Sequence, residues 1–340
     1  MVNHGICKIG TMINKLTCLS SNRAALVLLA FSLMTTAAAY GRTFSFAVIA
    51  DPHINGNPSQ SAKIKAAVDW IIGNKDGEDI ELAFVVGDIA WGGPRARRNL
   101  KQAKGMLDRL AGVGIAYVPI IGDNEIQGGC DREFAETFGP HYRRLAKVLP
   151  RWKKAPLPVN GRYLQNFSFD YKGCHFVCSD FNSRQRGNEG GELHDFAGGS
   201  WPWFKNDIKT CPKNKKESIV IFSHIGMFRT GFGMADDYLF SQSEMKKIKG
   251  FLYGYRDYVD SNYAGHIHQN WHASVWTGLF TTIYHVRTTD ETWYCRQWPE
   301  VADRSITVRL VEVDSDGARV SYKQHVRNAL KAQVSEYTSR

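Results

Sequence analysis

The chain alternates between apolar runs of strand length and amphipathic segments, and each apolar run ends abruptly at polar residues. In the first half these runs cover residues 43–50, 82–86 and 115–121. Helical spacing of apolar residues occupies 61–72 and 95–110 between them. The order strand, helix, strand predicts βαβ units around a buried sheet.

The second half continues the pattern. Residues 166–171 and 175–179 have the pattern of two paired strands. Further strand patterns cover 219–222, 258–264, 282–285 and 306–326, with a turn at 314–317. We expect the glycine-rich stretch 186–200 to form a long loop over the site, and the segment after Ala329 to be helical or frayed.

This pattern predicts an α/β fold and places the polar residues where ligands bind. In open α/β sheets, ligands bind outside the carboxyl ends of the strands, and that is where the polar residues stand here. The polar pattern extends from Asp51 to His268, and one site must gather all its parts. We therefore expect a single domain over residues 40–330 and a C-terminal tail over 331–340.

The N-terminal residues have the layout of an export signal. Asp and Glu are missing before Asp51, and Lys8, Lys15 and Arg23 precede an apolar run over 24–39 that ends in a small-residue cleavage pattern. This predicts a signal peptide over 1–39 and a periplasmic or secreted protein. The run is shorter than the roughly 20 residues of a comfortable bilayer span, but an uncleaved membrane anchor stays an alternative.

The charge of the chain bears on its binding partners, and its cysteine content bears on disulfides. The net charge is +10, but the basic residues are scattered over helix faces, so we expect no nucleic-acid partner and, with the leader cleaved, no stable membrane partner. Five cysteines follow the leader, which permits one or two disulfides in an oxidising compartment. Cys174 and Cys178 share one predicted strand, about 13 Å apart, too far to bridge each other.

Eight polar residues at the strand ends form a candidate metal site. They are carboxylates, imidazoles and one amide: Asp51, His53, Asp88, Asp123, Asn124, His224, His266 and His268. This mixture contains no thiolate and suits Mn, Fe or Zn. Two such ions about 3.5–4 Å apart can clamp the attacking and leaving oxygens of a phosphoryl displacement.

The order and spacing of these residues resemble the calcineurin-like metallophosphoesterase family. The matching motifs, over roughly residues 43 to 290, are Asp51-Pro-His53, Gly87-Asp88, Gly122-Asp-Asn-Glu125, His224 and Gly265-His-Ile-His268. The resemblance implies a four-layer α/β sandwich of two mixed sheets flanked by helices. It also implies hydrolysis of a small phosphorylated substrate by a metal-bound hydroxide.

The resemblance assigns the metal ligands residue by residue. Asp51, His53 and His268 would hold a first metal ion, divalent or trivalent, and Asp88 would bridge. The second ion would be held by Asp123, His224 and His266. The sequence departs from the family at Asp123 and Asn124, where Asn and His are usual; a shifted register with Asn124 as the ligand is the alternative.

This departure removes the histidine that is usually credited as general acid or phosphate contact. The amide of Asn124 does not donate a proton to a leaving alkoxide, though it can hydrogen-bond a phosphate oxygen. We expect His194 or His272 to supply the proton, or the substrate to have a good leaving group. A metal-binding but catalytically weak binding or scaffold protein is the alternative function. Arg184 and Arg186 could bind a phosphate or be solvated loop charges, and Trp91 could line a pocket or pack in a loop.

Overall fold

The computed structural model describes residues 44–185, 187–211, 218–228, 237–274, 282–286, 306–315, 320–329 and 334–339. The predicted leader over 1–39, Arg186 and Cys295 lie outside this part of the chain.

The first sheet has six strands, among which β1, β2 and β3 run parallel and β11, β12 and β13 are antiparallel. Their order across the sheet is β13-β12-β11-β1-β2-β3. Their bounds are Phe44–Ile49 (β1), Ile80–Val86 (β2), Ala116–Ile120 (β3), Thr307–Ser315 (β11), Val320–Asn328 (β12) and Val334–Ser339 (β13).

The second sheet has seven strands in the order β4-β5-β6-β7-β8-β10-β9. Strands β6, β7, β8 and β10 are parallel, and antiparallel pairs complete both edges. Their bounds are Lys153–Lys154 (β4), Phe167–Tyr171 (β5), Cys174–Cys178 (β6), Ser218–Phe222 (β7), Val259–Ala264 (β8), Trp271–Ser274 (β9) and Thr282–His285 (β10). Both sheets are therefore mixed.

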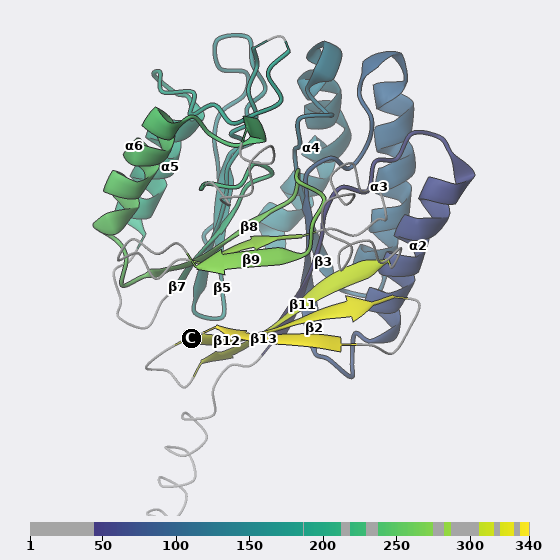
Figure 1. Ribbon diagram of the computed structural model, residues 1–340. Helices are drawn as coiled ribbons and strands as arrows, with labels where there is room; N and C mark the ends of the chain where they lie inside the picture. The colour runs from purple at the N-terminus through teal and green to yellow at the C-terminus, as the bar shows by residue number, and fades with distance from the viewer. Residues whose placement is uncertain are drawn as a thin grey trace, which may run out of the picture. The chain divides into compact units, whose positions relative to one another are not determined.

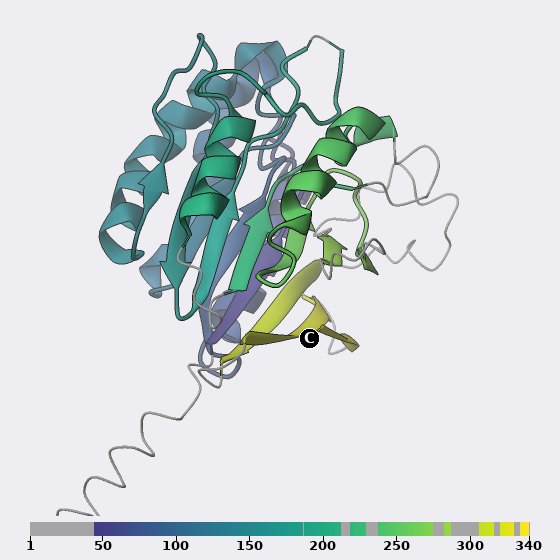
Figure 2. The ribbon, with the colours of Figure 1, turned by 90° about the vertical axis from the view of Figure 1, so that its left-hand side faces the viewer.

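Helices cover the outer faces of the two sheets (Figures 1 and 2). Figure 1 shows α2, α3 and α4 on the side of the first sheet and α5 and α6 on the side of the second. Their bounds are Pro58–Gly73 (α2), Ala96–Gly112 (α3), Asp131–Val148 (α4), Ser200–Thr210 (α5) and Gln242–Tyr253 (α6), with short 3₁₀ turns at Gly93–Arg95 (η1) and Gln127–Gly129 (η2).

Aromatic side chains join the inner faces of the two sheets. The Phe84 ring on β2 stacks on Phe222 of β7 with centroids 3.8 Å apart, and Phe46 of β1 meets Phe176 of β6 edge-on at 5.7 Å. The next residue along β6, Val177, belongs to the cluster under α5 and α6 instead, because successive strand residues face opposite sides. This alternation gives four layers, helices, sheet, sheet and helices, which confirms the predicted fold.

The predicted strands and the helices α2 and α3 are present, but other elements differ from the prediction. Helices α4, α5 and α6 were not predicted, and the expectation of a helical or frayed C-terminal segment is wrong. Strand β13 pairs there with β12, Tyr322 opposite Ser339. The described cysteines Cys130, Cys174, Cys178 and Cys211 are all buried, and no disulfide joins any two of these four. Within the described ranges, no helix is long and apolar enough to cross a membrane.

Candidate metal centre

Seven of the predicted site residues come together where the parallel strands of both sheets end. Each follows a strand: Asp51 and His53 follow β1, Asp88 follows β2, Asp123 follows β3, His224 follows β7, and His266 and His268 follow β8. We call these seven residues the Asp/His cluster. All are buried or nearly so, because the two sheets pack face to face and bring their strand ends together.

The cluster divides into two groups of possible metal ligands. Asp51, His53, Asp88 and His268 offer ligand atoms that lie within 4.8 Å of one another. Asp123, His224 and His266 form the second group by the same measure. These are the two ligand sets that the sequence motifs imply.

Asp88 lies between the two groups. Its Oδ2 is 3.1 Å from Nε2 of His53 in the first group, and its Oδ1 is 3.3 Å from Nε2 of His224 in the second. A carboxylate that faces two ligand sets is the arrangement needed to hold two cations close together. The geometry thus suits the bridging position that the sequence assigns to Asp88.

Hydrogen bonds to backbone carbonyls orient the histidines of the second group. The Nδ1 of His224 lies 3.1 Å from the Val86 oxygen, and Nε2 of His266 lies 3.0 Å from the Tyr238 oxygen. Each ring therefore donates one N–H to a carbonyl, and its other nitrogen faces Asp123 Oδ1, at 2.9 and 3.1 Å. Metal-binding histidines are usually held in this way.

The residues of the cluster fit bound cations. In His268 the Nδ1 atom is buried without a hydrogen-bond partner, a cost that a metal–nitrogen bond would remove. Burial raises the pKa of Asp51 to about 7, and the nearby Asp88 carboxylate adds to this rise. Burial and the neighbouring His53 lower the pKa of His268 to about 3. The three carboxylates and four imidazoles of the cluster are donor types that divalent ions bind in their deprotonated forms.

The backbone is strained where it presents these ligands. Five of the seven residues have positive φ angles, between 47° and 72°: Asp51, His53, Asp88, His266 and His268. Non-glycine residues adopt this conformation rarely, and it costs about 1–3 kcal/mol each. Such strain persists at functional sites because the surrounding structure holds it.

Gly122 shows how tightly the loops pack. A Cβ atom at this position would lie 2.1 Å from the backbone nitrogen of Asp88. Only glycine lets the loop after β3 approach the loop after β2 this closely. The neighbouring Glu125, which is not among the predicted site residues, holds the same two loops together. Its carboxylate accepts hydrogen bonds from the backbone N–H of Ala90 and of Gly122, both at 2.6 Å. The glutamate that ends the Gly122-Asp-Asn-Glu125 motif was the available signal.

Asn124 supports Asp88 instead of taking the second ligand position. Its backbone N–H donates to Asp88 Oδ1 at 2.9 Å, and its side-chain Nδ2 donates to Asp88 Oδ2 at 2.7 Å. Its Oδ1 accepts from Gln127 at 3.0 Å. Since Asp123 stands with His224 and His266, the geometry favours the unshifted register.

The two histidines considered as proton donors lie in neither group. His194 is completely buried: its Nε2 is 2.9 Å from the Asn182 oxygen, and its Nδ1 is 3.1 Å from both Arg162 and Glu192. With both nitrogens engaged, His194 has no N–H to give a leaving group in this conformation. His272 is partly exposed on strand β9, and its role stays a prediction.

The segment between β6 and α5 packs against the loop after β3, which carries Asp123. Asn182 donates to the Ile121 oxygen at 3.0 Å, which ties this segment to the end of β3. Arg184 is 8% exposed and forks onto both oxygens of Asp180, at 2.9 and 2.7 Å, so its guanidinium serves an internal ion pair.

Trp91 is 39% exposed, and its ring meets that of His53 edge-on at 5.8 Å. It therefore stands at the rim of the cluster.

A cleft of about 690 Å³ borders the cluster at Asp123. Its wall includes Gln127 on η2, Arg162, and residues 183–185 and 187–189 of the segment after β6. Because Gln127 also bonds Asn124, the cleft wall is joined directly to the residues around Asp88. The cleft is therefore contiguous with the candidate metal centre.

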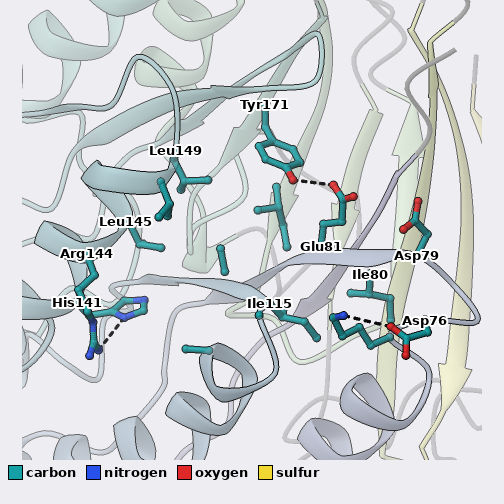
Figure 3. Close-up of a pocket in the computed structure, with 16 residues that line it drawn as sticks. Asp76, Asp79, Ile80, Glu81, Ile115, His141, Arg144, Leu145, Leu149 and Tyr171 are labelled. Atoms are coloured by element: carbon teal, nitrogen blue, oxygen red, sulfur yellow. Dashed lines mark hydrogen bonds and ion pairs between the residues drawn. The ribbon is translucent and has the colours of Figure 1, made fainter. Parts of the chain in front are cut away.

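A second cavity, of about 680 Å³, lies at the opposite ends of the strands (Figure 3). It is lined by Ile80 and Glu81 at the start of β2 and by His141 and Arg144 of α4. Several of its polar groups are paired: Tyr171 donates to Glu81 at 2.7 Å, and Arg144 contacts His141 at 3.3 Å. No residue of the Asp/His cluster lines it, so it is separate from the candidate metal centre.

The fold and the cluster define an α/β protein with a candidate metal centre of carboxylates and imidazoles. The chain belongs to the calcineurin-like phosphoesterase family, whose model matches residues 44–270. This confirms the family that the motifs indicated. No curated protein matches the chain.

Solved structures show the same fold at low sequence identity. A purple acid phosphatase from yellow lupin (Lupinus luteus) seeds is 12% identical, with a TM-score of 0.59; the match covers 88% of this chain and 53% of the lupin chain. This chain thus spans about half the length of that phosphatase. A dimetal phosphatase from Danio rerio, also 12% identical, has a TM-score of 0.51 over 82% of this chain and 98% of its own.

Proposed function

We propose that this protein is an exported, metal-dependent hydrolase of small phosphorylated substrates. The observation that carries the proposal is the position of Asp88, within 3.3 Å of a histidine in each of the two ligand groups. Membership of the calcineurin-like phosphoesterase family supports the reaction class. The predicted leader supports export to the periplasm or the medium, with a membrane-anchored form as the alternative.

The residues of the cluster have distinct tasks in this proposal. Asp51, His53 and His268 would hold one ion, Asp123, His224 and His266 the other, and Asp88 both. Mn, Fe or Zn ions bound there would stabilise charge on the phosphate oxygens and activate a water for attack. Glu125 and Asn124 keep the loops after β2 and β3, and with them Asp88, in place.

One observation favours the second candidate, a binding protein with weak turnover. Asn124 stands where the family usually has a histidine, and its side chain is occupied by Asp88 and Gln127. His194→Ala and His272→Ala variants test the remaining proton donors. If neither slows hydrolysis of an alkyl phosphate, a poor leaving group, neither histidine is the general acid.

The first experiment measures hydrolysis of p-nitrophenyl phosphate and its bis-ester with Mn²⁺ added, together with the metal content of the protein. We expect turnover that a chelator and Asp88→Asn both abolish, and the preferred ester separates monoesterase from diesterase activity. Bound metal without turnover would favour the binding role. A protein that binds no metal would refute the proposal.

The predictions about macromolecular partners have their own tests. A salt-dependent gel shift would contradict the expectation of no nucleic-acid partner. Recovery of the uncleaved chain in the membrane fraction would favour the anchored form over the exported one.

A further inference from the structure

The chemistry of the leaving group limits the substrates that this site can cleave. Asn124 occupies the position of the usual acid, and the nitrogens of His194 are both engaged. His272, the other histidine considered, belongs to neither ligand group and does not line the cleft beside Asp123. A leaving alkoxide is the base of an acid about as weak as water, with a pKa of about 15.7, whereas a leaving phosphate has a second pKa of about 6. A phosphate therefore leaves without a donated proton, and an alkoxide does not.

The cleft beside Asp123 presents a cation to such a leaving group. Two arginines are among its described residues, and they differ in exposure and in how fully other side chains already engage their guanidinium groups. Arg184 is 8% exposed and uses its fork on Asp180, whereas the Arg162 side chain is 35% exposed. Arg162 places only Nη1 against Glu192, at 3.3 Å, and His194, at 3.1 Å, and its guanidinium lies 5.5 Å from the Phe196 ring centre.

These contacts hold Arg162 at the cleft wall, and among the described residues they engage only its Nη1. His194, which the sequence suggested as an acid, thus helps to fix an arginine. A guanidinium fixed in this way loses little side-chain entropy on binding and matches the geometry of a phosphate.

We propose that the cleft binds an anionic phosphate leaving group through Arg162, so that the substrate is a phosphoanhydride. This inference rests on the proposed hydrolase function. The oxygen of a water forms a bond to the terminal phosphorus, and the bond from that phosphorus to the bridging oxygen breaks. The electron pair departs on the bridging oxygen of the leaving phosphate, and the proton of the water goes to solvent.

The cleft also contains acidic residues, and their positions are compatible with this role. Asp131 accepts a hydrogen bond from the backbone N–H of Tyr163 at 2.9 Å and lies 3.7 Å from Nε of Arg184, so its charge is balanced within the wall. Glu189 is exposed at the outer part of the loop. Asp123 belongs to the candidate metal centre, whose cations would neutralise it.

The test compares ADP with AMP, which share a nucleoside but differ in the leaving group. Phosphate release is measured with excess Mn²⁺, and p-nitrophenyl phosphate reports the proposed hydrolase function separately. We expect kcat/KM for ADP to exceed that for AMP on the order of 100-fold or more, the contribution that a general acid would otherwise supply.

Substitution of Arg162 tests the cleft itself. Arg162→Leu should lower the ratio of kcat/KM for ADP to that for p-nitrophenyl phosphate by roughly 10- to 100-fold, as for lost hydrogen bonds to a charged donor. Arg162→Lys should fall between the two, because it keeps the charge without the fork. Arg132→Leu is the matched control: Arg132 is 64% exposed, pairs with Glu136 and does not line the cleft.

Each outcome supports or overturns one statement. Equal hydrolysis of ADP and AMP, or turnover of p-nitrophenyl phosphate without turnover of ADP, would overturn the phosphoanhydride inference alone. An unchanged ratio in a folded Arg162→Leu protein would overturn the role of Arg162. Absence of metal-dependent turnover of all three compounds would instead overturn the proposed function on which the inference rests.

Discussion

A buried histidine between two carboxylates predicts an unusual dependence of stability on pH. His175 on β6 lies 2.6 Å from Asp170 and 2.9 Å from Asp207, and the latter belongs to α5. Arg151 and Lys153 also pair with these two carboxylates. Burial alone would lower the pKa of His175, but the two carboxylates outweigh it and raise the pKa to about 11.

Whether stability rises or falls with pH depends on which state, folded or unfolded, keeps the His175 proton. The folded protein keeps its proton on His175 up to about pH 11, whereas the unfolded chain releases it near the ordinary value of about 6.5. The stabilisation is therefore complete below about pH 6.5 and is lost as the pH rises through this window. Each pH unit removes up to about 1.4 kcal/mol from the free energy of unfolding.

The perturbation is His175→Gln, which leaves the two carboxylates without their shared cation. Breaking a buried ion pair costs about 3–5 kcal/mol, and we expect the lower part of this range at pH 7 because Arg151 and Lys153 remain. The difference from wild type should shrink by up to about 3 kcal/mol between pH 7 and pH 9, since wild type alone loses the histidine contribution.

Urea unfolding at the two pH values measures this directly. Lys65→Ala provides the control, because its partner Asp69 forms an exposed pair with side chains 62% and 37% accessible, and such pairs contribute about 0–1 kcal/mol. A His175→Gln difference below about 1 kcal/mol at pH 7, or one that is equal at pH 7 and pH 9, would refute the reasoning.

Three further substitutions test the candidate metal centre. Gly122→Ala forces a Cβ to within 2.1 Å of the Asp88 backbone. We therefore expect the free energy of unfolding, measured in urea, to fall by about 1–3 kcal/mol, and the bound metal, measured by elemental analysis, to decrease. Normal metal content would contradict the packing argument. Glu125→Gln turns one acceptor of a backbone N–H into a donor and should cost about 1.5–3 kcal/mol, and an unchanged unfolding midpoint would count against its loop-holding role. Asp123→Asn restores the usual amide ligand but removes a negative charge, so dialysis should remove the second ion before the first; equal retention of both ions would argue that Asp123 is not a ligand.

The cluster could be predicted from the sequence because its position depends on local pattern. Each ligand follows directly after an apolar strand, and parallel strands in one sheet bring their carboxyl ends to the same edge. The positions of Asp88 and His224 therefore follow once β2 and β7 are recognised. The ring orientation of His224, set by the Val86 oxygen, could not be predicted, because it depends on how the two sheets pack.

The elements that were not predicted, such as α4 and β13, either contain residues that argue against them or depend on contacts with distant parts of the chain. In α4, the buried residues Phe134, Phe138, Tyr142 and Leu145 have helical spacing, which favours a helix. Pro140 stands inside that helix, and proline in a helix interior argues against the assignment. For β13 the deciding contact is non-local: the backbone of β12 supplies the hydrogen bonds.

His194 shows why residue type and loop position do not assign a role. From the sequence, a histidine in a long loop near the metal motifs is a reasonable proton donor. In the structure the segment after β6 folds inward, Asn182 bonds the end of β3, and the ring of His194 is enclosed beside Arg162. The same folding that removes His194 from acid chemistry places Arg162 at the cleft wall. Because the folding of this loop leaves His194 unable to protonate a leaving group, the substrates that fit this site are those whose leaving group needs no proton.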